Sequence, residues 1–468
     1  MIKKIEDCNL YGQFIFGEIK EQYKGVMPFR KFFDSHNKDV DEIVDDILDE
    51  YGYKNIRTEQ LVSDYRTVLK IIVCNLILAI KGNTKYMSIS LNKTNYTNRI
   101  ERYEPFKITY TVFYNLVIWL ADNNYIDLYK ASSNPNGGII TVIKPLDILI
   151  ETVNAYEIKY FDVIVHSKYE YITVKDSNKL LVDYIDNEET KYRSSILESY
   201  NKLLNEQNIT IDNNLIQYPI ALESKYNHSV GLNGRIYGGD WINCKSELRS
   251  KIKINGKTTK EIDIKNCSIR LAAHLNNKFV PDNIDLYLLD GVDRNTVKLI
   301  SNIMLNINKT TSFIHGINNV TKAAFNSIKE QAVNRIIYSN NNNLSIEDKK
   351  LEKIKHFTII DNNKNNTDIL SDYGIEYTIN ALKEYVITIY NYYKLFADGW
   401  LMTGKGLELQ HKDSEICFKV IEKFLSMNKV VLTVHDSFIT VDEDIELLKE
   451  VIVDSYSEIV NYKPLLKY

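Results

Sequence analysis

The stretch that decides the fold is VVLTVHDSFIT, residues 430–440. Its first five residues and its last three are β-branched, apolar or aromatic, and such residues favour strands. Between them stand His435, Asp436 and Ser437, residue types that favour a tight turn. The stretch therefore predicts a β-hairpin that carries one carboxylate, Asp436, at its tip.

A second predicted strand supplies another carboxylate. The stretch KEIDI, residues 260–264, is interpreted as a strand that ends at Asp263. Two acids on adjacent strand ends can hold a pair of divalent cations for phosphoryl chemistry, so we expect Asp263 and Asp436 to lie about 4–6 Å apart and to bind Mg²⁺ or Mn²⁺. Two simpler interpretations stand beside this one: Asp263 caps the helix that follows it, and His435 is a hydrogen-bonded core residue.

Glycine and basic residues precede the KEIDI strand. The stretch GRIYGGD, residues 234–240, has three glycines that allow a backbone to approach a ligand closely. Arg235, Lys245 and Arg249 place positive charge beside it.

A helix is predicted directly after the strand, over residues 267–275. Within it Arg270 and His274 are four residues apart and share a face. Packing is the alternative role for His274.

A further predicted helix carries two cations. In DRNTVKLISNIMLNINKTTS, residues 293–312, Arg294 and Lys298 are four residues apart. Side chains at that spacing can reach the β- and γ-phosphates of one nucleotide. The alternative is a solvated helix face.

The chain before the hairpin predicts a helix that begins in GLELQHKDSEICF, residues 406–418. Gln410 is a candidate substrate ligand. Alternatively, Gln410, His411 and Asp413 lie just ahead of the helix and cap it.

One set of residues resembles motif A of the family A DNA polymerases: Asp263 at a strand end, followed in the chain by Arg270 and then by His274-Leu275. Arg249 resembles the arginine that lies upstream of that motif. This resemblance implies a polymerase-type palm.

Motifs B and C follow in the same order. Residues 293–312 are similar to motif B on the fingers helix, and His435-Asp436-Ser437 resembles motif C. The HDS form is closer to the single-subunit RNA polymerases of phages and mitochondria. The resemblance covers about residues 230–460, and the short spacing from A to B implies small fingers.

The resemblance implies a nucleotidyltransferase that adds nucleotides from NTPs or dNTPs to a 3′-hydroxyl of DNA or RNA. Asp263, Asp436 and the backbone carbonyl of Ile264 would hold the metals, and Arg294 and Lys298 would bind the phosphates. The remaining candidate substrate ligands are Arg249, Arg270, His274, Ser268, Asn306, Gln410 and His435.

Two residues depart from the family pattern. Ser268 stands where the DNA enzymes have a glutamate that excludes the ribose 2′-hydroxyl, and Asn306 stands where a tyrosine is usual. Both changes remove bulk and leave polar groups. Together with the HDS form they favour ribonucleotides.

The N-terminal part has its own organisation. Helices are predicted over residues 40–50, 61–81 and 108–123, and two strands flank an NPNGG turn at residues 134–138. Helices followed by such a hairpin are typical of a winged helix, and a helical cap is the alternative. Basic residues that would meet nucleic-acid phosphates are Lys85, Lys93, Arg99, Arg102, Lys107 and Lys130.

The amino-acid composition is that of an ordinary soluble globular protein. The 468 residues are 44% hydrophobic and 26% charged, with a net charge of −4, so any basic surface is local. The five cysteines form no CxxC pair and predict free thiols. No signal peptide or membrane span is predicted, which favours an intracellular protein. The Asn- and Lys-rich stretch 340–366 predicts an exposed loop.

We therefore expect an α+β protein in three parts. Residues 1–150 form a helical, winged-helix-like region, 151–230 a connecting region and 231–468 a palm with small helical fingers. Two rival functions stand beside the polymerase: a non-catalytic DNA-binding initiator or regulator of a mobile element, and a metal-dependent nuclease, which would need further clustered acids.

Overall fold

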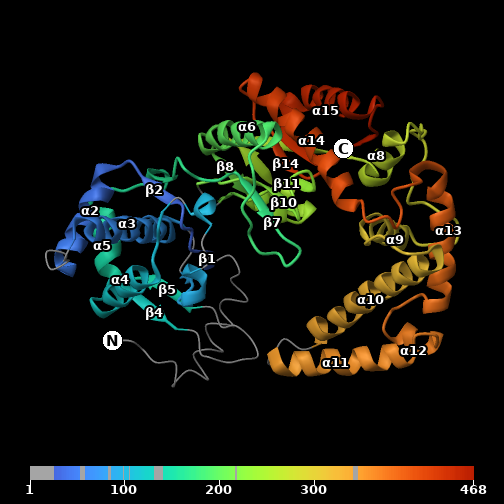
Figure 1. Cartoon of the computed structure of the whole chain (residues 1–468), viewed down its shortest axis with the longest axis horizontal. Helices are drawn as coiled ribbons and strands as arrows, with labels where there is room; N and C mark the ends of the chain where they lie inside the picture. The colour runs from blue at the N-terminus through green and yellow to red at the C-terminus, as the bar shows by residue number, and fades with distance from the viewer. Residues whose placement is uncertain are drawn as a thin grey trace. The chain divides into compact units, whose positions relative to one another are not determined.

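The computed structural model describes residues 26–52, 58–82, 86–97, 100–104, 106–130, 141–216, 219–340 and 346–468. The chain divides into two compact units. Unit 1 comprises Met1–Ser224 and Tyr237–Gly256, and unit 2 comprises Lys225–Ile236 and Lys257–Tyr468. Both units combine helices with strands (Figure 1), so the predicted mixture of α and β structure is confirmed. The predicted palm, fingers and domain boundaries near 150 and 230 stay predictions.

Unit 1 packs an apolar core against a four-stranded sheet, in which the strands follow the order β1 (Val26–Pro28), β3 (Tyr86–Ile89), β5 (Thr141–Pro145), β4 (Ile126–Tyr129). Its helices are α2 (Lys38–Tyr51), α3 (Glu59–Lys81), α4 (Tyr110–Asp122), α5 (Asp147–Ala155), α6 (Glu188–Asn205) and α7 (Ser246–Arg249). Its strands are β1 (Val26–Pro28), β2 (Phe33–Ser35), β3 (Tyr86–Ile89), β4 (Ile126–Tyr129), β5 (Thr141–Pro145), β6 (Val163–Val165), β7 (Ile172–Lys175), β8 (Ile209–Ile211), β9 (Asn214–Leu215) and β12 (Ile252–Ile254).

The three predicted N-terminal helices are present as α2, α3 and α4. Residues 71–79 of helix α3 are all buried, as this mostly apolar stretch requires, whereas its first turn is exposed. The predicted hairpin strands are β4 and β5, which pair antiparallel with Ile126 opposite Pro145. Their NPNGG turn lies outside the described residues, and the winged-helix arrangement stays a prediction.

The basic flank of this region is partly neutralised. Arg102 bonds Asp183, Asp186 and Glu170, with donor–acceptor distances of 2.8–3.3 Å. A guanidinium shared by three carboxylates has few donors left, which argues against a phosphate contact, and the role of Arg102 stays a prediction. Lys85 and Arg99 lie outside the described residues.

Unit 2 contains the predicted hairpin and its partner strand. Its strands are β10 (Glu223–Asn227, shared with unit 1), β11 (Asn233–Tyr237), β13 (Lys257–Ile264), β14 (Leu432–Val434), β15 (Ser437–Val441) and β16 (Leu466–Lys467). Its helices are α8 (Cys267–Leu275), α9 (Arg294–Asn306), α10 (Phe313–Asn340), α11 (Ile346–Asn362), α12 (Thr367–Asp372), α13 (Ile379–Ala397), α14 (Gly406–Ser426) and α15 (Ile445–Val460).

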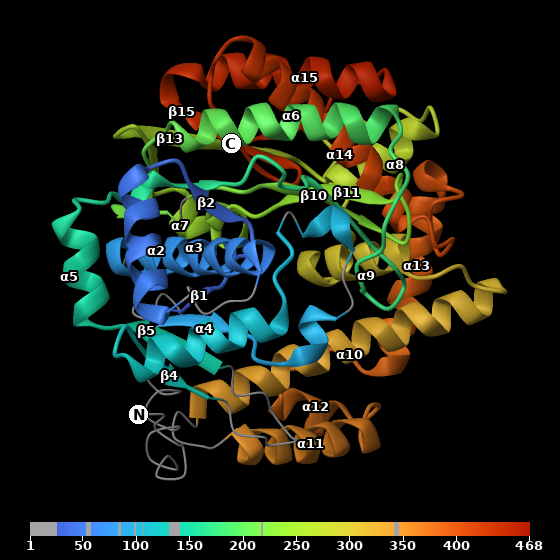
Figure 2. The same ribbon diagram turned by 60° about the vertical axis from the view of Figure 1, so that its left-hand side comes forward.

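The centre of unit 2 is an antiparallel ladder in the order β14-β15-β13-β16. Helix α15 packs on β13 and β15, and it also contacts α14 and α8 (Figure 2). Since α14 leads into β14 and α8 leaves β13, the elements that carry the predicted acids share one core.

Helices α9 to α13 lie in the chain between the two predicted acids, a larger insertion than the small fingers we expected. The predicted loop over 340–366 is wrong for residues 346–362, which form α11. Although α11 is mostly polar, it packs against α10. Its residue Ile360 is fully buried. Ion pairs Lys329–Asp361 and Lys353–Glu330 tie the two helices together at 2.6 and 2.9 Å.

Two absences concern the described residues alone. Cys74, Cys244, Cys267 and Cys417 form no disulfide bond among the described residues, and Cys8 lies outside the described ranges. Among the helices of those ranges, none has the length and apolar character needed to cross a membrane.

Candidate active site in unit 2

The predicted hairpin is confirmed as β14 and β15, joined by the two-residue turn His435-Asp436. His435 adopts a left-handed conformation with φ of 58°, which a tight turn requires. Strand β15 pairs with β13 so that Ser437 stands opposite Asp263. The Ile264 amide donates to the Asp436 carbonyl at 3.1 Å. Strand pairing therefore brings the two sequence-distant aspartates together.

The other edge of β13 is held by the C-terminal strand. Leu466 pairs with Ile264, and the Lys265 amide donates to the Leu465 carbonyl at 2.8 Å. Successive peptide groups of a strand face opposite neighbours. The Ile264 carbonyl therefore faces the Asp436 side, as its predicted role in a metal shell requires.

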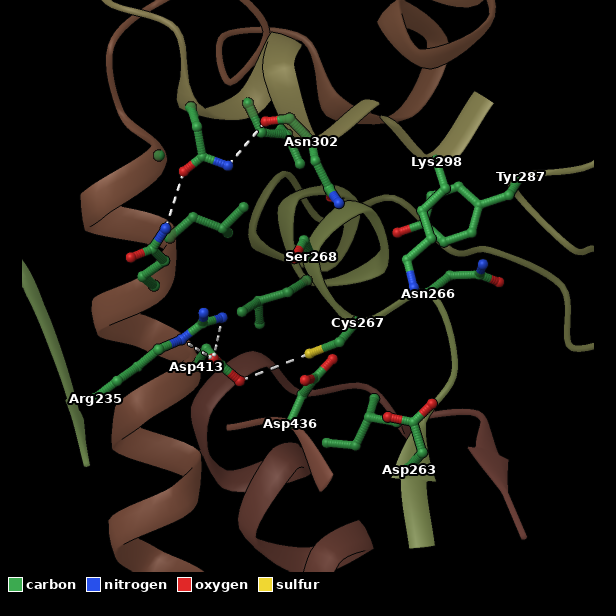
Figure 3. A pocket seen from close by; sticks show the side chains of 17 residues that line it. Arg235, Asp263, Asn266, Cys267, Ser268, Tyr287, Lys298, Asn302, Asp413 and Asp436 are labelled. Atoms are coloured by element: carbon green, nitrogen blue, oxygen red, sulfur yellow. Dashed lines mark hydrogen bonds and ion pairs between the residues drawn. The ribbon is translucent and has the colours of Figure 1, made fainter. Parts of the chain in front are cut away.

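A pocket of about 350 Å³ opens above these strand ends, within the size range of small-molecule sites. Seven predicted site residues line it: Asp263, Ile264, Ser268, Lys298, Asn306, Gln410 and Asp436. Figure 3 shows the Asp263 and Asp436 carboxylates on one side of the pocket and the Lys298 side chain reaching toward it from α9.

Asp413 and Arg235 also line the pocket, although neither was among the predicted site residues. Arg235 projects from β11, and its Nε and Nη2 atoms donate to Asp413 Oδ2 at 2.8 and 2.7 Å. Cys267 Sγ lies 3.8 Å from Asp413 Oδ1. These contacts tie β11, α8 and α14 to one carboxylate.

The prediction that Gln410, His411 and Asp413 cap a helix is wrong. Helix α14 already begins at Gly406, so all three lie inside it. Asp413 is buried between Leu409 and Ile416, on the apolar face of the helix. A charge on that face was the signal in the sequence that could have identified it.

Burial and like charge dominate the electrostatics. Burial raises the pKa of Asp436 to about 7, and the negative charges of Asp413 and Asp263 add to the effect. Burial alone would lower the pKa of Arg235, but Asp413 and Asp436 reverse this and raise it. Burial and the nearby Arg235 lower the pKa of His435, which keeps that ring neutral at physiological pH.

The far wall of the pocket is built where α9 meets α14. The Asn306 amide oxygen accepts from Gln410 Nε2 at 2.9 Å, and its Nδ2 donates to the Asn302 carbonyl at 2.8 Å. A Cβ on Gly406 would lie 2.5 Å from Asn306 Oδ1 and 2.6 Å from the Leu305 carbonyl. Only glycine therefore allows the two helices to approach this closely.

Arg294 does not join Lys298 in lining the pocket. Its Nε donates to Asp285 at 3.1 Å, and its guanidinium lies 5.5 Å from the centre of the Tyr287 ring. Asp285 also accepts from Asn266 Nδ2 at 3.1 Å. In this structure the predicted phosphate ligand is thus bound to a carboxylate.

Four other predicted residues lie elsewhere. Arg270 is buried and donates to the carbonyls of residues 280, 281 and 284, so it holds a loop. His274 is buried, stacked on Tyr462 and bonded to the Tyr456 hydroxyl at 2.9 Å. His435 forms the turn without lining the pocket, and Arg249 belongs to unit 1.

The cap interpretation of Asp263 is also excluded. Residue Asn266, with φ of 54°, occupies the N-cap of α8, and Asp263 lies three residues earlier, within β13. The amide oxygen of Asn266 is buried without a hydrogen-bond partner among the described residues. Asn266 is itself one of the residues that line the pocket.

A divalent cation fits the donors at the strand ends. Asp263 and Asp436 present carboxylates to one pocket. Burial first, and then the negative charges of Asp413 and Asp263, raise the pKa of Asp436, and a bound cation would offset both effects. Within the described ranges, no three or more His, Cys, Asp or Glu side chains are grouped to hold a metal. Two carboxylates are nevertheless a usual protein share for Mg²⁺, whose other ligands are water and phosphate oxygens.

Comparison with known proteins leaves the family unassigned. No family model and no curated protein matches the chain. A solved structure described as "POL domain of Pol1 from M. smegmatis complex with DNA primer-template and dNTP" aligns at 11% identity with a TM-score of 0.22. The alignment covers 59% of this chain and 51% of that chain, about half its length. So weak a likeness carries no argument, and the function must be argued from the site.

Proposed function

We propose that this protein is a nucleotidyltransferase that adds nucleotides from nucleoside triphosphates to a 3′-hydroxyl of DNA or RNA. The observation that carries the proposal is the convergence of Asp263, Asp436 and Lys298 on one pocket, from two paired strand ends and a separate helix. Enzymes catalyse phosphoryl transfer largely by positioning the reactants and neutralising phosphate charge. Two carboxylates that can hold divalent metal ions, next to a lysine ammonium, meet both needs.

The two carboxylates would hold Mg²⁺ or Mn²⁺, which supplies a lowered pKa for the attacking hydroxyl and positive charge for the triphosphate. The protein's own contribution is positional. Pairing of β13 with β15 fixes Asp263 against the Asp436 turn. The Lys298 ammonium, exposed on α9, binds phosphate oxygens. Arg294 joins it only after leaving Asp285.

The lining also bears on the choice of sugar. Ser268 is half-buried in the pocket wall and offers a small hydroxyl. The Asn306 amide is engaged by Gln410 and by its own helix, so Ser268 is the freer of the two groups. We therefore propose that NTPs are incorporated at least as efficiently as dNTPs.

The test is incubation of purified protein with labelled NTPs or dNTPs, Mg²⁺ or Mn²⁺, and a panel of DNA and RNA primers, templates and single strands. We expect metal-dependent extension that both Asp263→Asn and Asp436→Asn abolish. Binding of nucleic acid without extension on any substrate would instead support the non-catalytic regulator. A hundredfold preference in kcat/KM for dNTPs would overturn the ribonucleotide proposal and leave the polymerase standing.

A further inference from the structure

The buried ion pair between Arg235 and Asp413 stands at the wall of the pocket. The Asp413 side chain is 6% exposed and the Arg235 side chain 20%. A buried pair of this kind contributes little net stability, because desolvation offsets the attraction, and apolar residues of similar size often serve as well. Stability alone therefore does not account for two charges at this position.

The ion pair uses only one of the two carboxylate oxygens of Asp413. Both donating atoms of Arg235 converge on a single oxygen, Asp413 Oδ2, at 2.8 and 2.7 Å. Asp436 lines the same pocket, and its charge, together with the larger effect of Asp413, raises the pKa of the Arg235 guanidinium despite burial. Yet the described residues include no ion pair between Arg235 and Asp436, because the guanidinium is held by Asp413 instead (Figure 3).

An arginine beside a metal-binding carboxylate is a competitor for it. A guanidinium makes two-point bonds with carboxylates, and such bonds are strong where water is excluded. If Arg235 turned to Asp436, it would neutralise the carboxylate that the cation needs. In this structure Asp413 binds the guanidinium instead.

We propose that Asp413 is a positioning residue that holds the Arg235 guanidinium off Asp436 and so keeps the Asp436 carboxylate available to a divalent cation. The inference rests on the proposed function for its metal site. It assigns Asp413 no direct bond to the cation: Asp413 acts through Arg235.

The experiment is a double-mutant cycle on cation affinity, measured without nucleotide by calorimetric titration with Mn²⁺ and by the Mg²⁺-dependent shift in Tm. The variants are Asp413→Asn, Arg235→Met and the double variant. Asp413→Asn should weaken Mn²⁺ binding by about tenfold or more, the size of one competing charge-assisted contact. In the Arg235→Met background the same change should weaken it far less, since only the field of Asp413 is then lost.

The controls separate the possible causes. Glu415→Gln alters another acid of α14, one that bonds Lys412 and His411 outside the pocket, and should leave Mn²⁺ affinity unchanged. Asp263→Asn should remove most of the affinity. If Asp413→Asn folds too poorly to titrate, Asp413→Glu displaces the carboxylate while keeping its charge, and it should still weaken binding when Arg235 is present.

The outcomes are distinct. Equal losses in the two backgrounds would overturn the inference, because Asp413 would then act by its own charge or as a ligand. Unchanged affinity in Asp413→Asn would overturn it as well. In either case metal-dependent extension by the parent protein would still support the proposed function, whereas a parent protein that binds no divalent cation would overturn both.

Discussion

Asp436 stands where the sequence turns between two buried strands, and its role is open to direct test. Replacing Asp263 or Asp436 by Asn removes a charged metal ligand and should lower nucleotide incorporation at least about a hundredfold while the fold remains. Lys298→Ala should also reduce the rate, through loss of a phosphate contact. Single-turnover extension assays measure both effects, and Glu446→Gln on the exposed surface of α15 is the control. Parental rates in both aspartate variants would contradict the assignment.

The perturbed charge of Asp436 also makes stability depend on pH. Its pKa lies near 7 in the folded protein, above the ordinary value of 3.8. Between these values the folded state binds more protons than the unfolded state, so this group lowers stability as pH rises from about 4 to about 7.

Asp436→Asn removes that dependence. In EDTA at pH 8 the variant should be more stable than the parent, by at most about 4 kcal/mol, and the difference should shrink toward pH 4. Thermal unfolding of both proteins from pH 4 to pH 8 provides the measurement. Parallel Tm curves would show that the folded carboxylate titrates normally.

Site residues could be predicted from the sequence where they lie on a strand or helix that the sequence itself predicts. Asp263 and Asp436 each stand at a strand end, and the pairing of those strands brings the two together. Lys298 was predicted from its place on a helix, four residues after Arg294. Arg235 and Asp413 meet only through tertiary packing of β11 against α14. Nothing local marks that contact except the charge on the apolar face of α14, because the two residues are far apart in the chain.

At the scale of elements, the contact between α9 and α14 sets the width of the pocket. Gly406→Val would force the helix ends apart, since its Cβ has no room against Leu305 and Asn306. The free energy of unfolding should fall by about 1–3 kcal/mol, and KM for the nucleotide should rise more than kcat falls. Glu408→Ala, in the same helical turn and exposed, is the control. An unchanged KM would show that this wall does not contact the nucleotide.

Elements with a strong period were predicted better than polar ones. Helix α8 was predicted to the residue over 267–275, and the hairpin around residues 435–436 followed from its β-branched flanks. Helix α11 was missed because its asparagines and lysines outweigh the few apolar side chains that pack on α10. The size of the helical insertion was likewise hidden, since the spacing between two motifs says nothing about what lies beyond the second.

At the scale of the whole molecule, the question is whether unit 1 contacts nucleic acid. Helix α4, which precedes the β4–β5 strands, contains no Lys or Arg, and Arg102 is held by acids. Lys107 and Lys130 are among the remaining basic candidates. Replacing both by Glu should lower affinity for duplex DNA about tenfold and reduce the slope of log K against log salt by about two.

Fluorescence anisotropy at several salt concentrations measures that slope in the full chain. Lys191→Glu is the matched control, because Lys191 lies on α6 of the same unit and its side chain is 65% exposed. A slope equal to that of the parent would mean that the helices and the β4–β5 strands act as a structural cap.

The division of the chain into two interleaved units also limits which gene fragments can transfer this site by recombination. The path visits unit 2 at Lys225–Ile236, returns to unit 1, and re-enters unit 2 at Lys257. A gene fragment that begins at codon 257 would encode both strand-end aspartates but not Arg235. Recombination could therefore transfer the complete pocket lining only with a breakpoint upstream of codon 235, and the fragment would also contain residues 237–256 of unit 1.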